Sequence, residues 1–177
     1  MGEGNLTLPP CGPPLPLHRR SANGGDGEGG GRGEGEVYSA YAPHYDPQGQ
    51  GQWSLALIDF TLTTLLPRYR RRPRTALDLA CGTGTAVLAL ARAGLATIGL
   101  DRSRAMLAIA RDKATRASVP CHFVRADLRA FAFARPFDLI TCCYDSLNYL
   151  ADPTDLRAAF AQTRAALAPG GLFVCDL

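Results

Sequence analysis

The stretch Thr75-Ala76-Leu77-Asp78-Leu79-Ala80-Cys81-Gly82-Thr83-Gly84 decides the fold that this sequence predicts. Its first six residues are typical of a short apolar strand. The two glycines after them allow a tight turn and let the backbone pass close to a ligand without a Cβ in the way. The apolar residues 86–93 then predict a helix that ends at Gly94, which stands in the C′ position. A strand, a glycine-containing turn and a helix in this order indicate an α/β unit.

The alternation of apolar strands and helices continues along the rest of the chain. Strands are expected at residues 75–80, 96–101, 121–125, 137–143 and 172–177. Helices are expected at about 52–66, 86–93, 103–117 and from Pro153 to about Leu167. Continuously apolar strands that alternate with helices form a parallel sheet covered on both faces. The fold class is therefore α/β, with a doubly wound, mainly parallel sheet of about five strands.

Two of these helices carry more detailed expectations. In the helix at 52–66, Trp53, Leu57 and Phe60 share one face. Ile58, Leu62 and Leu65 widen that face, which predicts a largely buried helix. In the last helix, Asp152 is the expected N-cap and Pro153 occupies the first turn. The residues Pro169-Gly170-Gly171 are expected to end that helix before the final strand begins.

The composition divides the chain into two parts. The chain has 177 residues, 46% of them apolar, and a formal net charge of +3, which fits one soluble domain. Residues 1–36 contain 11 of the 19 glycines and 5 of the 13 prolines, which predicts a disordered tail. That tail lacks the continuous apolar stretch of a secretory signal. Residues 37–177 form the expected folded domain, and no apolar run approaches the roughly 20 residues that span a bilayer.

The cysteines predict a reduced interior. The six of them form no Cys-x-x-Cys pair, and five lie in apolar surroundings, where a free thiol behaves as a small buried hydrophobe. We therefore expect neither a metal site nor disulfides, and a cytoplasmic protein.

The carboxyl ends of the strands are where such a sheet binds ligands. Asp101 ends the second strand, 17 residues after Gly84, and a carboxylate there can accept hydrogen bonds from both hydroxyls of a ribose. An N-cap for the helix that starts near Ser103 is the other interpretation of Asp101. A dinucleotide fingerprint requires glycine at position 87, where the chain has Val87. Asp78, which precedes the turn, would repel phosphates and favour a cationic ligand. These residues point to a nucleoside-containing cofactor other than NAD.

The turn at 78–84 resembles the first motif of class I S-adenosylmethionine-dependent methyltransferases. Later stretches resemble further motifs of that family, in order and at the expected spacing: Gly99-Leu100-Asp101, Met106 to Ala110, Ala126-Asp127-Leu128, Phe137 to Ile140, Asp145 to Leu150, and Leu167 to Gly171. The resemblance covers about residues 37–177 and implies a Rossmann-like fold with S-adenosyl-L-methionine as cofactor.

The resemblance also implies a role for each matching position. The residues expected around the methionine part of the cofactor are Asp78 near its amino group, Ala80, Gly82, Gly84, and Cys143 (after Cys142) under the sulfonium. Those expected around its nucleoside are Asp101 with the adjacent Arg102 at the ribose, Asp127 and Leu128 at the adenine amino group, and Met106. A methionine at helical spacing is equally a plain core residue, so Met106 has two interpretations. The family often contributes an aromatic residue from its N-terminal segment, for which Tyr38, Tyr41 and Tyr45 are the candidates.

Methyl transfer is an in-line displacement that needs alignment more than a dedicated set of catalytic residues. Asp145 is the preferred candidate for a base that faces the acceptor, followed by Tyr41. We expect a small-molecule acceptor with a nitrogen or oxygen nucleophile. An RNA methyltransferase is one alternative, since five arginines lie between residues 68 and 74, but they precede the first strand and face away from the expected site. The other alternative is a non-catalytic cofactor-binding module.

The family resemblance carries one expectation about completeness. Full class I domains have seven strands, whereas this chain stops at Leu177, at about the fifth. We therefore expect the final antiparallel hairpin to be missing and the domain to be incomplete at its C-terminus.

Overall fold

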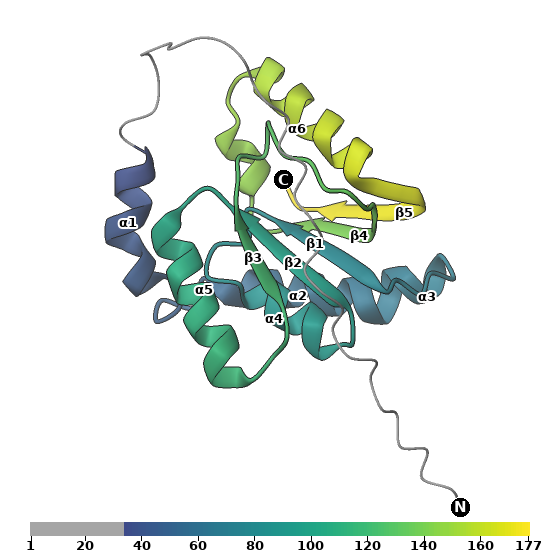
Figure 1. Cartoon of the computed structure of the whole chain (residues 1–177), viewed down its shortest axis with the longest axis horizontal. Coiled ribbons are helices and arrows are strands. Elements are labelled where there is room, and N and C mark those ends of the chain that lie inside the picture. Colours follow the sequence, from purple (N-terminus) through teal and green to yellow (C-terminus); the bar gives the residue numbers. More distant parts are fainter. Residues whose placement is uncertain (1–33) are drawn as a thin grey trace, which may run out of the picture.

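The computed structural model describes residues 34–177, shown as the coloured ribbon in Figure 1. The predicted disordered tail falls mostly on residues 1–33, outside the described residues. Its last three residues are different, because helix α1 (Glu34–Tyr45) already begins at Glu34. The stretch with the three tyrosines, for which the sequence pattern gave no helix, is therefore helical, with Pro43 inside it.

Five parallel strands form one sheet, as predicted. They are β1 (Thr75–Leu79), β2 (Ala96–Asp101), β3 (His122–Arg125), β4 (Phe137–Cys142) and β5 (Leu167–Cys175). The spatial order is β3-β2-β1-β4-β5, so the strand order reverses between β1 and β4. Within residues 34–177, no antiparallel strand pairs with these five, and β5 is an edge strand.

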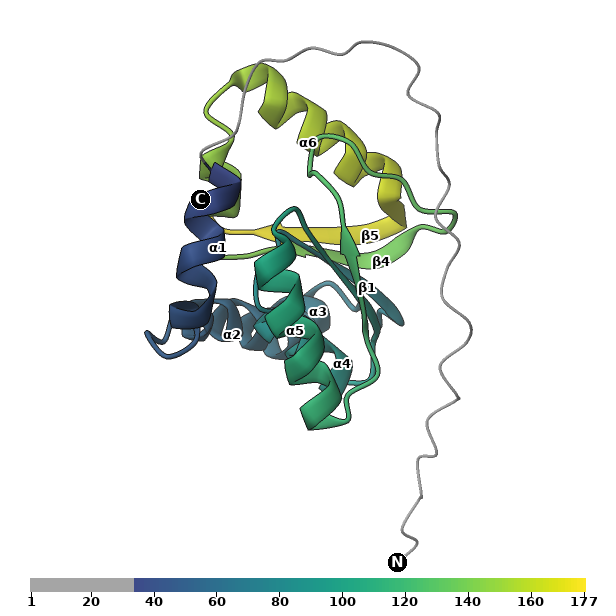
Figure 2. The same cartoon turned by 60° about the vertical axis from the view of Figure 1, so that its left-hand side comes forward.

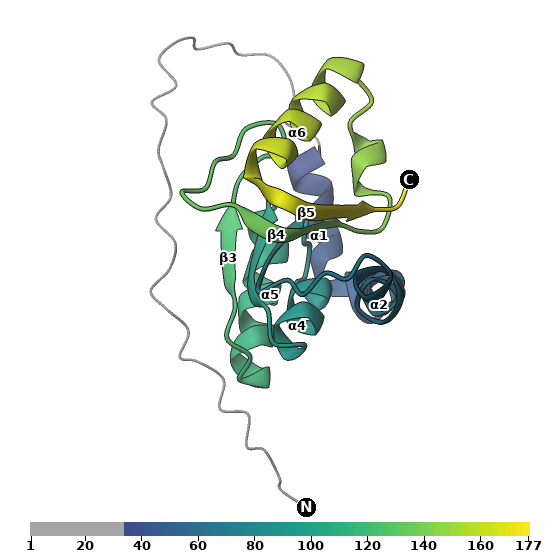
Figure 3. The ribbon, with the colours of Figure 1, turned by 90° about the vertical axis from the view of Figure 1, so that its right-hand side faces the viewer.

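Helices cover both faces of the sheet (Figure 3). On one face lie α2 (Gly51–Phe60), which continues through η1 (Thr61–Leu65) and α3 (Leu66–Arg68), together with α4 (Thr85–Arg92) and α5 (Arg104–Ala117). On the other face lies α6 (Pro153–Ala166), which follows the short 3₁₀ helix η2 (Ser146–Tyr149). Figure 2 shows α1 beside α5, at the end of the sheet where the strands finish.

The core follows the alternation of side chains along the strands. On β1, Leu77 and Leu79 join the apolar cluster under α6, whereas Ala76 joins the cluster under α2 and α4. All three are buried, as expected for a strand covered on both faces. The expected caps are also present: the side chain of Asp152 accepts a hydrogen bond of 2.7 Å from the backbone N–H of Thr154, and Gly94 follows the end of α4 with φ of 91°.

The predicted buried face of the helix at 52–66 is wrong at its two aromatic residues. Trp53 and Phe60 are 65% and 48% exposed, whereas Ile58 is buried and Leu57 and Leu62 pack against the core, as expected. The reason is the close approach of α2 to α4, since a Cβ at Gly51 would lie 2.9 Å from the hydroxyl oxygen of Thr85. Small residues permit that approach, and the two aromatic rings remain on the outer side.

The predicted start of the last strand is wrong, although the helix before it ends at Ala166, close to the predicted end at about Leu167. β5 begins at Leu167, so Pro169-Gly170-Gly171 belongs to the strand. Proline disfavours helical geometry at the residue before it, which agrees with a helix that does not reach Pro169. The register then shifts, with Phe137 opposite Leu167 and Leu139 opposite Leu172. Gly171 allows this irregularity, because a Cβ there would lie 2.9 Å from the carbonyl oxygen of Asp138.

Candidate active site

A cavity of about 680 Å³ opens at the carboxyl ends of the strands, where the strand order reverses. Several segments contribute to its wall: α1, the turn after β1, the ends of β2 and β3, the loop after β4, and the start of α6. Ten of the residues that the sequence predicts for the site line it: Tyr38, Tyr41, Tyr45, Ala80, Gly82, Asp101, Arg102, Met106, Asp127 and Leu128. A cavity of this size at a topological switch point is the expected position of a ligand site in such a fold.

The two glycines of the first turn have different roles. Gly82 has φ of 52°, and no atom lies within 4 Å of where its Cβ would be, so the backbone there faces open space in the cavity wall. Gly84 has φ of 77°, and its Cβ would lie 2.9 Å from Phe123 and 3.0 Å from Ala110. Gly84 therefore lets α4 start against β3 and α5, and it does not line the cavity.

Asp101 connects the end of β2 to this turn. Its carboxylate accepts hydrogen bonds from the backbone N–H of Gly82 at 2.8 Å and of Ser103 at 2.7 Å. The N-cap of α5 is Ser103, whose hydroxyl accepts from the backbone N–H of Met106, so the interpretation of Asp101 as that cap is wrong. Burial raises the pKa of Asp101, and the two backbone donors lower it in part. Asp101 is a buried acceptor on the cavity wall.

Asp78 lies on β1 and is 2% exposed. The hydroxyl of Thr141 on β4 donates a hydrogen bond of 2.7 Å to its Oδ1, and the thiol of Cys143 lies 3.9 Å from the same oxygen. Desolvation raises the pKa of Asp78 to about 7, although the hydrogen bonds from Thr141 and Cys143 lower it in part. Asp78 and Cys143 both lie outside the cavity lining.

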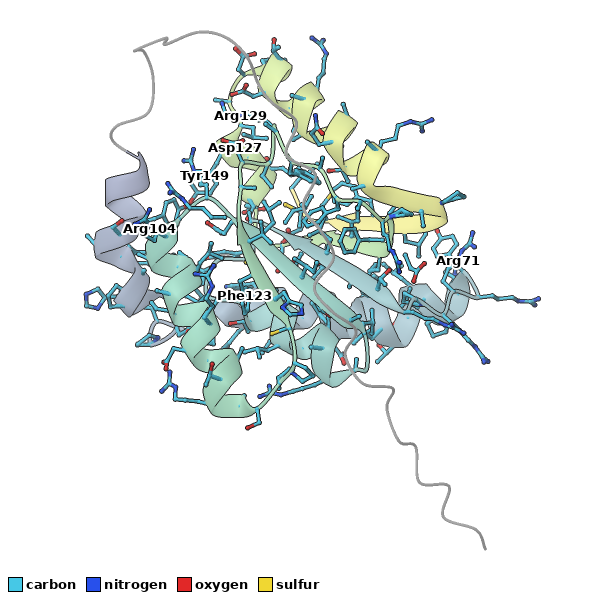
Figure 4. All side chains as sticks on the ribbon, in the orientation of Figure 1. Arg71, Arg104, Phe123, Asp127, Arg129 and Tyr149 are labelled. Carbon is cyan, nitrogen blue, oxygen red and sulfur yellow. The ribbon has the colours of Figure 1, made fainter. Side chains whose placement is uncertain are left out.

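Asp127, which the family resemblance assigns to the adenine, belongs to an ion-pair cluster. The guanidinium of Arg129 donates to both carboxylate oxygens of Asp127, at 2.9 and 2.8 Å, and to Asp155 of α6 at 2.8 Å. Contact with Arg129 lowers the pKa of Asp127. All three side chains line the cavity, so Arg129 connects the loop after β3 to the start of α6 across this wall. Figure 4 shows Asp127 and Arg129 side by side, with Tyr149 close to them.

Five tyrosines form an aromatic wall of the cavity: Tyr38, Tyr41, Tyr45, Tyr144 and Tyr149. Edge-to-face contacts join them across segments, with ring centroids 5.9 Å apart for Tyr38 and Tyr149 and 6.4 Å apart for Tyr45 and Tyr144. Burial raises the pKa of both Tyr38 and Tyr45, which keeps the two phenols neutral. The electron-rich faces of such rings attract cations.

Comparison with protein families decides the identity of this site. Residues 76–171 match a family model described as a methyltransferase domain, which covers more than half of the chain. The chain belongs to the class I S-adenosylmethionine-dependent methyltransferase family. The five parallel strands and the glycine turn match the fold of that family.

Individual relatives agree with this assignment. The chain is 34% identical over 115 residues to dTDP-3-amino-3,6-dideoxy-alpha-D-glucopyranose N,N-dimethyltransferase of Streptomyces fradiae, which covers 65% of this chain and 44% of that protein. An S-adenosylmethionine-dependent methyltransferase from Clostridium acetobutylicum has a similar structure, with a TM-score of 0.67, 31% identity, and coverage of 78% of this chain and 56% of that chain. A third similar structure is an amino pentose methyltransferase of Micromonospora echinaspora with bound S-adenosylmethionine, with a TM-score of 0.63, 31% identity, and coverage of 74% and 54%.

The chain spans about half the length of the curated relatives that it matches, between 41% and 62% for the first four.

The preferred base of the sequence analysis lies outside the cavity lining of this methyltransferase domain. Asp145 is exposed, and its backbone N–H donates to Asp176. Tyr144 and Asp145 have φ of 62° and 54°, which non-glycine residues adopt at an energetic cost. Two successive residues of this kind place a strained turn between β4 and η2, beside the tyrosine wall.

Twelve of the lining residues were not predicted from the sequence, among them Gln50, Arg129, Tyr144, Ser146 and Asp155. Tyr144 directly follows the expected end of β4, and Arg129 directly follows Leu128, so adjacency to a strand end was the available signal. Gln50 had none, since its contact with the hydroxyl of Tyr144 joins segments 94 residues apart.

The arginine-rich stretch lies away from the cavity, as expected. Figure 4 shows Arg71 at the opposite end of the sheet from Asp127 and Tyr149. There the guanidinium of Arg71 lies beside Gly170, and the backbone N–H of Arg74 donates to Asp138 at 2.8 Å. Among residues 34–177, no group of three His, Cys, Asp or Glu side chains could hold a metal ion, and no helix is long and apolar enough to cross a membrane.

Proposed function

We propose that this chain transfers a methyl group from S-adenosyl-L-methionine to a nitrogen or oxygen nucleophile of a small-molecule acceptor by in-line displacement. The observation that carries the proposal is the 2.8 Å hydrogen bond between Gly82 and Asp101, which brings an open glycine turn and a buried carboxylate onto one wall of the cavity. A nucleoside with an amino-acid tail needs both features in one place.

The residues of the cavity fit this cofactor. Each carboxylate oxygen of Asp101 accepts one backbone hydrogen bond and has a second lone pair for a ribose hydroxyl. The open space at Gly82 accepts a chain that a side chain would otherwise block. Asp78 lies just outside the lining and, when ionised, supplies negative charge for an α-amino group. Asp127 supplies an acceptor for an adenine, and Leu128 supplies apolar contact. Met106 is 2% exposed and lines the cavity, which agrees with both of its interpretations.

S-adenosylmethionine, when bound, supplies a methyl group that its positively charged sulfur activates. The chain's own residues orient the two reactants and exclude water. The tyrosine wall does both, because its rings cover the cavity and its faces favour a positive charge, worth about 0.5–2 kcal/mol per contact. Alignment of this kind provides most of the acceleration of a displacement reaction.

We propose an amino group as the preferred nucleophile of the acceptor. The relative from Streptomyces fradiae is named for an amino sugar, and the protein of the Micromonospora structure for an amino pentose. A neutral amine attacks without a base. Tyr41, which lines the cavity and donates to Gln48, and Asp145, which is exposed beside Tyr144, stay our candidates for handling a proton of the acceptor.

We further propose that the protein works in the cytoplasm. Its cysteines at positions 81, 121, 142, 143 and 175 form no disulfide with one another, and a reducing compartment keeps cysteines in this state. The predicted free thiol of Cys11 lies outside the described residues.

Calorimetric titration tests the cofactor, and transfer of a labelled methyl group tests the reaction. We expect S-adenosylmethionine and S-adenosylhomocysteine to bind and NAD to give no heat. With tritiated donor, we expect label to enter nucleotide-linked amino sugars before the matching hydroxy sugars and before RNA. Binding of NAD without a response to the methyl donor would contradict the cofactor. Binding of the donor without transfer to any acceptor would instead favour the non-catalytic module.

A further inference from the structure

Lys113 is the only lysine of the chain, beside 18 arginines, and its ammonium group is enclosed by oxygen atoms. From α5 it donates to Asp46 Oδ2 at 2.8 Å, to Thr85 Oγ1 at 2.9 Å and to Thr83 Oγ1 at 3.3 Å. Only 21% of its side chain is exposed. Three acceptors in three directions suit the compact ammonium group, whereas the planar guanidinium of arginine presents its donors as a fork.

Asp46 is held from a second side as well. The hydroxyl of Thr83 donates to Asp46 Oδ1 at 2.7 Å, and Thr83 is itself 1% exposed. Both carboxylate oxygens of Asp46 therefore have a donor, each from a different segment. We call the four residues Asp46, Thr83, Thr85 and Lys113 the lysine cluster.

The lysine cluster joins the covering helix of the cavity to the turn beneath it. Asp46 directly follows Tyr45, the last residue of α1, and Thr83 lies between Gly82 and Gly84 of the cavity turn. Between Tyr38 and Tyr45, Ala42 is the one fully buried residue, so apolar burial contributes little to holding α1. Figure 2 shows α1 lying beside α5, from which Lys113 reaches it.

We propose that Lys113 is a positioning residue, which holds α1 and its tyrosines over the cofactor and couples closure of this helix to cofactor binding. The inference rests on the proposed function, because the ligand under α1 is taken to be S-adenosylmethionine or its product. Cofactor in the cavity supports the tyrosines from below, and the lysine cluster holds the end of their helix. The contact of the cofactor with the tyrosines and the hydrogen bonds of the lysine cluster therefore stabilise the same position of α1.

The single lysine provides a direct measurement. An acetylating reagent reacts with Lys113 when the ion pair with Asp46 opens, and mass spectrometry of the peptide that contains Lys113 gives the rate. We expect saturating S-adenosylhomocysteine to slow this acetylation at least about fivefold. Asp46→Asn should acetylate faster than wild type without ligand and should bind S-adenosylhomocysteine about tenfold more weakly. The matched control is Asp112→Asn, which removes an exposed ion pair with Arg116 on the same helix and should change neither value.

A double-variant comparison separates positioning from local stability. Lys113→Met and Tyr45→Leu should each weaken the binding of S-adenosylhomocysteine. The double variant should lose no more affinity than the weaker-binding single variant, since both substitutions act through α1. Melting without ligand checks that each variant is folded. The inference is overturned if S-adenosylhomocysteine binds wild type without slowing acetylation, or if the two losses add. A wild type that binds no S-adenosylhomocysteine overturns the proposed function itself and with it this inference, which the first titration shows before any variant is compared.

Discussion

Thr141 on β4 donates a hydrogen bond of 2.7 Å to the carboxyl group of Asp78 on the neighbouring strand β1. The two residues face each other across the parallel pair at matching register positions. This contact and the thiol of Cys143 are the polar side-chain partners that the described residues give a carboxyl group with 2% exposure. Burial outweighs both partners and raises its pKa to about 7, so the site holds a proton that a cationic ligand would displace.

Cofactor affinity should therefore depend on pH. Below pH 7, Asp78 is mostly protonated in the free protein and must ionise before it can pair with an α-amino group. We expect the dissociation constant of S-adenosylhomocysteine to fall up to about tenfold per pH unit between pH 5.5 and 7, and to level off above pH 8. Calorimetry in two buffers of different ionisation enthalpy should show proton release at pH 6. Asp78→Asn is the control, with weak binding that does not change over this range.

The same residue should lower the stability of the free protein at high pH. The folded pKa of about 7 lies above the ordinary value of 3.8, so between pH 4 and 7 the native state holds a proton that the unfolded state releases. The contribution of Asp78 to stability is full below pH 4 and is lost as the pH rises through 7. We expect Asp78→Asn to melt several degrees higher than wild type at pH 8 without ligand, and to differ little at pH 4.5. Equal melting temperatures at pH 8 would contradict the burial cost.

Asp101→Ala should weaken cofactor binding about 10- to 100-fold. The loss of hydrogen bonds to a charged acceptor costs about 1.5–3 kcal/mol, and each 1.4 kcal/mol is tenfold in affinity. The variant also removes the acceptor of the backbone N–H of Gly82, so part of the lost affinity reflects a less ordered turn. Titration of a folded variant checks the value. Asp138→Ala is the matched control, since Asp138 also accepts backbone hydrogen bonds, from Arg74 and Thr75 outside the cavity, and its loss should lower the melting temperature with little effect on affinity. Unchanged affinity in Asp101→Ala would restrict Asp101 to fastening the turn.

The strands could be predicted from the sequence because their signal is local. Residues 96–101 are apolar, end at an aspartate and begin just after a helix-ending glycine, and β2 has those bounds. The buried face of a helix is harder to predict from the sequence. Periodicity shows which residues share a face but not which face packs against the core. Trp53 and Phe60 do share a face, and it is the exposed one, because Gly51 on the same helix lies against Thr85 of α4.

The site also contains residues that the sequence predicts and residues that it does not. Gly82 and Asp101 belong to strand ends with a recognisable pattern, and the structure places both on the cavity wall. The contacts of Arg129 with Asp155 and of Lys113 with Asp46 join residues 26 and 67 positions apart. No pattern within a short window contains such a pair, and only the assembled layers bring its members together.

Arg129→Met should weaken cofactor binding more than loss of a surface charge explains. It leaves Asp127 without the guanidinium that contacts both of its oxygens, and it separates the loop after β3 from Asp155. We expect the pKa of Asp127 to rise toward its ordinary value and the dissociation constant of S-adenosylhomocysteine to increase about fivefold. Arg116→Met, which breaks the exposed pair with Asp112, is the control and should leave affinity unchanged. If both variants bind S-adenosylhomocysteine equally well, Arg129 makes only a surface ion pair and does not support the cofactor site.

Shortened chains should locate the N-terminal boundary of the cofactor site. A chain that begins at Val37 retains Tyr38, Tyr41 and Tyr45 on the cavity wall, together with Asp46, so we expect its affinity for S-adenosylhomocysteine to stay within about twofold of the full chain. A chain that begins at Gln52 loses all four and also Gln50, the partner of Tyr144. Its sheet keeps its strand pairing, but α5 loses the contact with α1, and Lys113 and Thr83 lose their carboxylate partner.

We therefore expect the chain from Gln52 to melt cooperatively at a lower temperature and to bind S-adenosylhomocysteine at least about tenfold more weakly. Titration and thermal unfolding of both chains, side by side with the full chain, measure the two effects separately. Loss of binding in the chain from Val37 would show that residues 1–36 contribute to the site, against the interpretation of them as dispensable. Full affinity in the chain from Gln52 would remove α1 and its tyrosines from the site altogether.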